Sequence, residues 1–100
     1  MEYHLYKSTN PKKKFMVKFL NQTTGRINTI HFGAYSYDDY TITNNDERKR
    51  LYIKRHINDN ITDLNFAGCW SMNLLWNKKT LEESIHDMEK RFKITIINRM

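Results

Sequence analysis

Residues 15–34 read FMVKFLNQTTGRINTIHFGA, and this stretch decides the fold that the sequence predicts. Phe15, Val17 and Phe19 alternate with residues of the opposite face, which is the period-two pattern of a half-buried strand. A polar loop over 21–25 ends in a glycine that tolerates a positive φ angle, and a second β-prone run rich in Ile and Thr follows. Two such runs joined by a short glycine-containing loop predict a β-hairpin that ends at residues 33–34.

Three helices are predicted downstream of the hairpin. The first covers 46–56, with Asp46 as its N-cap, and its scattered apolar residues indicate a helix that is only partly buried. The second covers 66–77 and is apolar nearly all round, which is typical of a buried central helix. The third starts at a capping box formed by Thr80 and Glu83 and continues with apolar residues at helical spacing.

A short β-rich run over 94–97 closes the chain and can add a third strand to the hairpin. The predicted fold is therefore an α+β domain with the order ββαααβ. Residues 1–13 are polar and end in a turn signal at Asn10-Pro11, so we expect a flexible basic leader followed by one domain over residues 14–100.

Composition limits the class of protein. The 100 residues are 39% hydrophobic and include 13% aromatic residues, which is enough for one packed core. A lone Cys69 excludes an internal disulfide, and no apolar run is long enough to span a bilayer or to serve as a secretory signal. We expect a soluble intracellular protein with no membrane partner.

The formal net charge of +6 is concentrated near the start of the chain. Residues 1–37 hold six basic residues and one acidic residue, a net charge of +5, and Lys12, Lys13 and Lys14 form the densest cluster. Such an excess favours polyanions such as nucleic acid, or an acidic protein surface. The alternative is that a bias toward AT-rich codons, visible in the many Asn, Ile and Lys residues, accounts for part of the basicity.

The helix over 46–56 carries the best candidate binding face. Arg48, Tyr52 and Arg55 recur at spacings of four and three, and His56 lies four residues beyond Tyr52. Guanidinium groups beside a phenol suit phosphate binding combined with stacking on a base, and the three-lysine cluster could add phosphate contacts. The alternative is a solvated helix whose arginines pair with nearby carboxylates.

The two tryptophans are six residues apart and would point about 120° apart on a helix. We therefore expect Trp70 to lie in the core. Trp76, next to Lys78 and Lys79, is predicted to be the exposed anchor for a protein partner.

Metal and catalytic sites are not indicated. The histidines and Cys69 lack the spacing of a zinc site, and the chain has neither a phosphate-binding glycine-rich loop nor a nucleophile elbow. We expect no metal, no cofactor and no enzymatic activity. A phosphodiesterase-like hydrolase would require His31, Asp39 and His56 to converge in one pocket.

Six segments follow one another along residues 31–85. They are His31-Phe32-Gly33-Ala34, Asp39-Tyr40-Thr41, a charged run that ends in Arg55-His56, Ala67-Gly68-Cys69-Trp70-Ser71, Leu74-Leu75-Trp76-Asn77-Lys78 and Thr80-Leu81 through Ser84-Ile85. In this order they resemble a family of small proteins encoded by nucleocytoplasmic large DNA viruses of amoebae and algae. The resemblance implies a giant-virus origin and a location in the host cytoplasm, the viral factory or the virion. It implies no catalytic residue.

The sequence thus favours a small basic protein that binds nucleic acid without strong sequence preference, in replication, transcription or genome packaging. The alternative is a virion structural or interaction protein whose positive surface meets an acidic capsid or core partner. The sequence does not set the oligomeric state.

Overall fold

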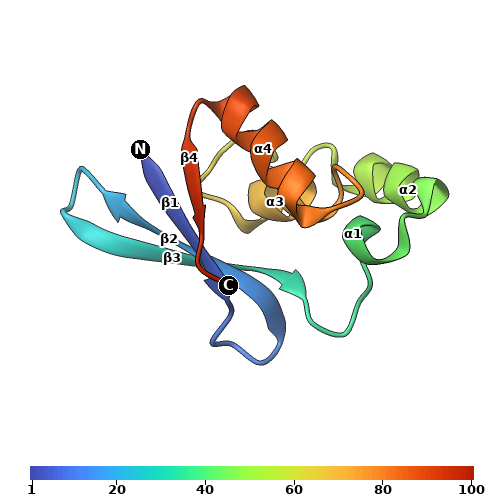
Figure 1. Ribbon diagram of the computed structural model, residues 1–100, viewed down its shortest axis with the longest axis horizontal. Helices are drawn as coiled ribbons and strands as arrows, with labels where there is room; N and C mark the ends of the chain where they lie inside the picture. Colours follow the sequence, from blue (N-terminus) through green and yellow to red (C-terminus); the bar gives the residue numbers. More distant parts are fainter.

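A four-stranded mixed sheet with helices on one side forms the protein in the computed structural model, which describes residues 1–100 (Figure 1). The strands lie in the order β3-β2-β1-β4. Their bounds are β1 Glu2–Lys7, β2 Lys13–Asn21, β3 Arg26–Ala34 and β4 Thr95–Asn98. The α+β fold predicted from the sequence is confirmed, with one more strand than expected.

The predicted hairpin is formed by β2 and β3. These strands pair antiparallel, with Val17 opposite Ile30 and Phe15 opposite Phe32, so that their apolar faces coincide. Gly25 in the connecting loop has a φ of +73°, as the turn requires. Val17, Phe19 and Phe32 on the shared face are buried, and Met16 is buried on the opposite face of β2.

The expectation of a flexible leader over residues 1–13 is wrong for residues 2–7, which form β1. Tyr3 and Leu5 are buried, and they pair with Phe19 and Val17 across an antiparallel ladder. Only two apolar side chains in six residues carry the alternation, which is too short a pattern to stand out beside polar neighbours. β4 pairs with β1 in parallel, so it adds to the sheet beside β1 and not beside the hairpin.

Helices follow the hairpin in the predicted order. Their bounds are α1 Tyr40–Thr43, α2 Asp46–His56, α3 Ala67–Trp70, the π-helical turn η1 Ser71–Leu75 and α4 Leu81–Phe92. α1 is a single turn within a segment expected to be irregular. The N-cap of α2 is Asn45, whose side chain accepts from the Arg48 amide, and not Asp46 as the sequence suggested. The capping box at Thr80 is confirmed.

The core lies between the sheet and the segment formed by α3 and η1. Trp70 is fully buried, as predicted, and its indole Nε1 donates to the Leu64 carbonyl at 2.9 Å. Its ring packs against Tyr3 and Phe32 of the sheet, and α4 covers η1 from the other side. No helix of the structure has the length and apolar character needed to cross a bilayer.

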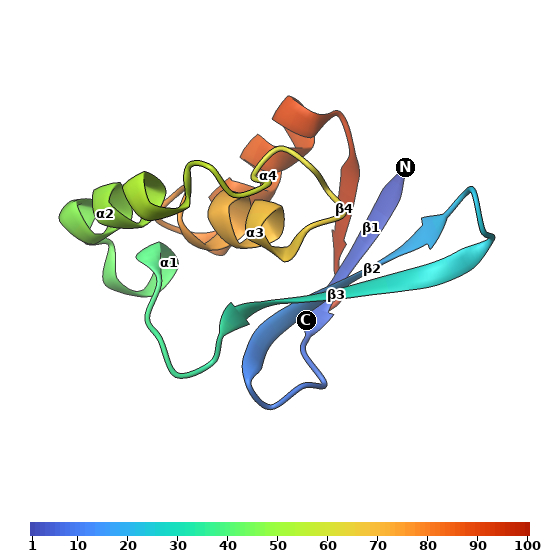
Figure 2. The ribbon, with the colours of Figure 1, turned by 180° about the vertical axis from the view of Figure 1, so that it is seen from behind.

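α2 lies further out than the other long helix. Figures 1 and 2 both show α1 and α2 beyond the edge of the layer that α3 and α4 form on the sheet, at the side where β3 ends. α2 has no fully buried residue, although Tyr52 and Ile53 pack against the core. This partial burial agrees with the sequence prediction and leaves a cleft between α2 and the sheet.

Candidate functional site

The cleft of about 660 Å³ lies between α2, the open end of the hairpin where β2 begins and β3 ends, and the loop before α1. It gathers six of the seven residues that the sequence singled out for nucleic-acid binding: Lys13, Lys14, Arg48, Tyr52, Arg55 and His56. Lys12 is the exception, because it lies in the exposed turn that precedes β2 and does not line the cleft. Two parts of the chain that are separated by more than thirty residues in the sequence therefore contribute to one site.

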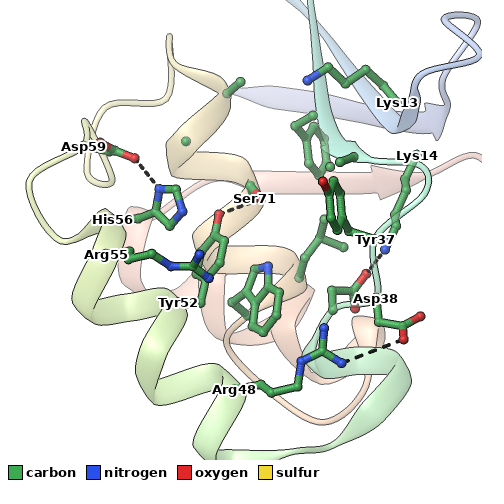
Figure 3. Close-up of a pocket in the computed structure, with 18 of the residues that line it drawn as sticks. Lys13, Lys14, Tyr37, Asp38, Arg48, Tyr52, Arg55, His56, Asp59 and Ser71 are labelled. Carbon is green, nitrogen blue, oxygen red and sulfur yellow. Dashed lines mark hydrogen bonds and ion pairs between the residues drawn. The ribbon is translucent and has the colours of Figure 1, made fainter.

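One wall of the cleft is the face of α2 predicted from the residue spacing. Residues 48, 52 and 55 share this face because steps of four and three residues bring side chains back to the same side of a helix. Figure 3 shows Tyr52, Arg55 and His56 together on this wall, with Arg48 reaching toward the opposite one. Arg55 makes no ion pair and no hydrogen bond with another side chain, so its five donors remain available to a ligand.

Aromatic rings form a stack behind this wall. The Tyr52 ring lies 4.3 Å from the Trp76 ring, centroid to centroid, with the planes 6° from parallel. The His56 ring lies 4.3 Å from the Tyr52 ring at an angle of 31°. Burial raises the pKa of Tyr52, although its hydrogen bond to Ser71 acts the other way, so the phenol stays neutral at ordinary pH.

The stack corrects the prediction for Trp76. This side chain is only 9% exposed and belongs to the core, so it is not the exposed anchor that the sequence suggested. Trp76 follows η1 directly and is covered by Tyr52 of α2, a contact between two segments that the spacing within either one does not indicate. Lys78 and Lys79 are exposed, and their part in partner binding remains a prediction.

An ion pair holds the opposite wall in place. Lys14 Nζ donates to Asp39 Oδ2 at 2.5 Å, and the two side chains are only 12% and 3% exposed. Asp39 Oδ1 accepts hydrogen bonds from the amide and the hydroxyl of Thr41, so Asp39 is also the N-cap of α1. Lys14 thus already has a counter-ion, and this pair fixes the loop before α1 against β2, while its predicted phosphate contact stays a prediction.

The remaining charges of the cleft are unevenly engaged. Four cationic side chains face three carboxylates there, an excess of one positive charge with His56 neutral. His56 Nδ1 donates to Asp59 at 2.7 Å, which occupies that carboxylate. Arg48 lies 3.8 Å from Asp38, a loose pair between exposed groups that a stronger anion can replace. Lys13 and Arg55 have no carboxylate within 4.0 Å.

The cleft also contains residues that were not among the site residues chosen from the sequence, and Gly33, Tyr37, Asp59 and Ser71 are four of them. Gly33 has a φ of +78°, and a Cβ at this position would lie 2.7 Å from Leu75 Cδ1, so only glycine lets β3 approach η1 this closely. Tyr37 belongs to a tyrosine-rich segment that precedes α1 and α2, and its nearness in the sequence to the cationic residues of α2 was the available signal. Nothing in the sequence indicated Ser71, which reaches the cleft through the fold alone.

The catalytic alternative does not assemble. Asp39 and His56 both line the cleft, but His31 does not. His31 precedes the buried Phe32 on β3, so its side chain lies on the other face of the sheet, where its Nδ1 forms a 2.7 Å hydrogen bond with Ser8 Oγ. The three residues that a phosphodiesterase-like site would need are therefore not brought together.

The chain belongs to a family of unknown function, DUF5754, whose family model matches residues 3–56. The matched region runs from β1 to the end of α2 and contains all seven predicted nucleic-acid residues. No curated protein and no solved structure matches the chain.

Proposed function

We propose that the protein binds nucleic acid without strong sequence preference, through the cleft between α2 and the β2–β3 hairpin. The single observation that supports this proposal most is the convergence of the cationic and aromatic residues on one cleft. Lys13, Arg48 and Arg55 are the groups that would contact phosphates, because none of them is committed to a close ion pair. Such contacts carry little sequence information, which accounts for the lack of preference.

The rival proposal, an acidic protein partner, has less support from the geometry. It relied on Trp76 as an exposed aromatic anchor, and this ring is buried in the stack with Tyr52. Lys78 and Lys79 alone provide charge without the buried aromatic contact that dominates most protein interfaces.

The segments that resemble giant-virus proteins support a wider proposal about origin. We infer that the protein is virally encoded and acts in the host cytoplasm, the viral factory or the virion, in replication, transcription or genome packaging. Cross-linking in infected cells tests this part: contacts with nucleic acid support it, and contacts with one acidic protein and no nucleic acid would favour the rival proposal.

Salt dependence of binding is the direct test of the electrostatic mechanism. Three phosphate contacts predict that log Kobs falls against log [salt] with a slope of about −2 on single strands, which is about a twentyfold loss between 50 and 200 mM salt. Fluorescence anisotropy with a labelled oligonucleotide measures this slope. An affinity that hardly changes over this range would eliminate the mechanism.

A matched pair of variants locates the contact. Arg55→Ala removes a cation from the cleft, whereas Lys54→Ala removes one from the neighbouring exposed position on α2, outside the cleft. We expect Arg55→Ala to weaken binding and to reduce the salt slope by about 0.7, while Lys54→Ala changes the slope little. Equal effects of the two changes would indicate a diffuse charge effect and would contradict a cleft-centred site.

A further inference from the structure

We propose that the cleft receives an unpaired base, so that the protein selects single-stranded nucleic acid over duplex. This inference rests on the proposed function and specifies its ligand class. Phosphate contacts alone would not distinguish the two forms, so the inference depends on the aromatic groups of the cleft.

Tyr37 is the first of these groups. Its side chain is 71% exposed, it lines the cleft, and it makes no ring contact and no side-chain hydrogen bond within the protein. Its backbone is fixed, because the Tyr37 amide donates to the Ala34 carbonyl and the nearby Asp39 is held by Lys14. An aromatic ring that lines a cleft on an anchored loop, with nothing packed on it, offers a free face to a flat ligand.

The opposite wall is an ordered stack in which the Tyr52 ring lies between the Trp76 and His56 rings, each 4.3 Å away, so Tyr52 supports the stack and leaves its free faces to its neighbours. Figure 3 shows Tyr52 and His56 on the α2 side of the cleft and Tyr37 across from them. The Tyr52 hydroxyl is held by Ser71 at 3.0 Å, and His56 is held by Asp59. Because these side chains are already ordered, a base that enters between the walls loses little free energy to side-chain ordering.

The size and charge of the cleft fit one nucleotide. A volume of about 660 Å³ is in the range of sites for small ligands, and Lys13 and Arg55, which line the cleft, are the cations that would contact the flanking phosphates. Asp38, which follows Tyr37 in the chain and also lines the cleft, can accept a hydrogen bond from a base N–H group.

A duplex cannot use this arrangement. Its bases are paired and stacked on one another, so their faces are hidden unless a base is extruded at a cost of a few kcal/mol. A single strand presents base faces at no such cost, and every base has a face that stacks on an aromatic side chain. The selectivity therefore concerns strandedness and not sequence.

Three labelled probes test the inference by fluorescence anisotropy at one salt concentration. They are a short oligothymidylate, its duplex with oligoadenylate, and an abasic oligomer of the same length that keeps the phosphates and lacks the bases. We expect the duplex and the abasic oligomer each to bind at least about fivefold more weakly than the single strand, from the usual contribution of base–aromatic stacking.

Tyr37→Ala and Tyr35→Ala form the matched variants, because both tyrosines are 71% exposed and only Tyr37 lines the cleft. We expect Tyr37→Ala to lower the affinity for the single strand to that for the abasic oligomer and to leave abasic binding unchanged. Tyr35→Ala should change neither affinity. Neither change removes a packed side chain, so both variants should fold like the parent protein, which circular dichroism verifies.

Two other outcomes are decisive. If the single strand, the duplex and the abasic oligomer bind equally and Tyr37→Ala has no effect, the inference is overturned and the proposed function stands. If none of the probes binds, both the inference and the proposed function are overturned.

Discussion

Replacing Lys14 by Met should destabilise the protein by about 3 kcal/mol, because the Asp39 carboxylate then stays buried without its counter-charge. The ammonium and the carboxylate are 2.5 Å apart, and their side chains are 12% and 3% exposed. Loss of one partner of such a pair usually costs 3–5 kcal/mol, roughly, and the lower end applies here because Thr41 continues to donate to Asp39. Methionine keeps the length of the side chain, so little packing is lost.

Urea unfolding monitored by tryptophan fluorescence measures this change, since both indoles are buried in the native state. A loss of about 3 kcal/mol corresponds to a fall in melting temperature of roughly 12–24 °C for a domain of this size. The midpoint should move while the slope with urea stays constant, as expected when stability changes and the exposed area does not.

Two controls separate charge burial from other effects. Lys12→Met, in the exposed turn, should cost less than about 0.5 kcal/mol. The double variant Lys14→Met with Asp39→Asn should recover part of the loss, because no buried charge remains and the asparagine oxygen can still cap α1. If Lys14→Met and Lys12→Met have the same midpoint, the ion pair does not hold the wall of the cleft, and the reasoning is refuted.

Three further perturbations probe other parts of the structure. Gly33→Ala should lower the free energy of unfolding in urea by about 2 kcal/mol, because of the positive φ at this position and the close approach of Leu75. Gly25→Ala should cost less, because nothing lies within 4 Å of its added methyl group, and equal costs would refute a role for the contact with Leu75. Burial raises the pKa of the Cys69 thiol to about 11, so iodoacetamide at pH 8 should modify this thiol only in the unfolded protein, and rapid modification of the native protein would contradict this. The stability that the raised pKa contributes is full below the ordinary thiol pKa of 9.0 and is lost as the pH rises through 11. Thr80→Ala should cost about 1 kcal/mol by removing the N-cap of α4, and an unchanged urea midpoint would show that the cap contributes nothing.

The sequence was most informative where one local pattern was sufficient. The β2–β3 hairpin and the capped α4 carry complete local signals. The hairpin has two β-prone runs joined by a glycine-containing turn, and α4 has a capping box followed by apolar residues at helical spacing. The burial of Trp70 also followed from local pattern, because the helix that contains it is apolar nearly all round.

The sequence was least informative where distant contacts decide the structure. β1 forms because it pairs with β2 and β4, and its own six residues show little of this. Trp76 is buried because η1 and α2 bring it against Tyr52, a contact that no spacing within either segment indicates. The candidate site shows the same division: the α2 face followed from helical periodicity, whereas its approach to Lys13, Tyr37 and Ser71 depends on the tertiary fold.

The most direct test of the nucleic-acid cleft compares two double variants that remove the same charge. Lys13→Ala with Arg55→Ala removes two cations from the cleft, and Lys12→Ala with Lys54→Ala removes two from adjacent exposed positions outside it. The measured quantity is the salt slope of binding to a labelled single strand. The proposed cleft predicts that the first variant loses about 1.4 of the slope, roughly 0.7 for each phosphate contact, while the second retains nearly all of it. Equal slopes for the two variants would contradict binding through the cleft.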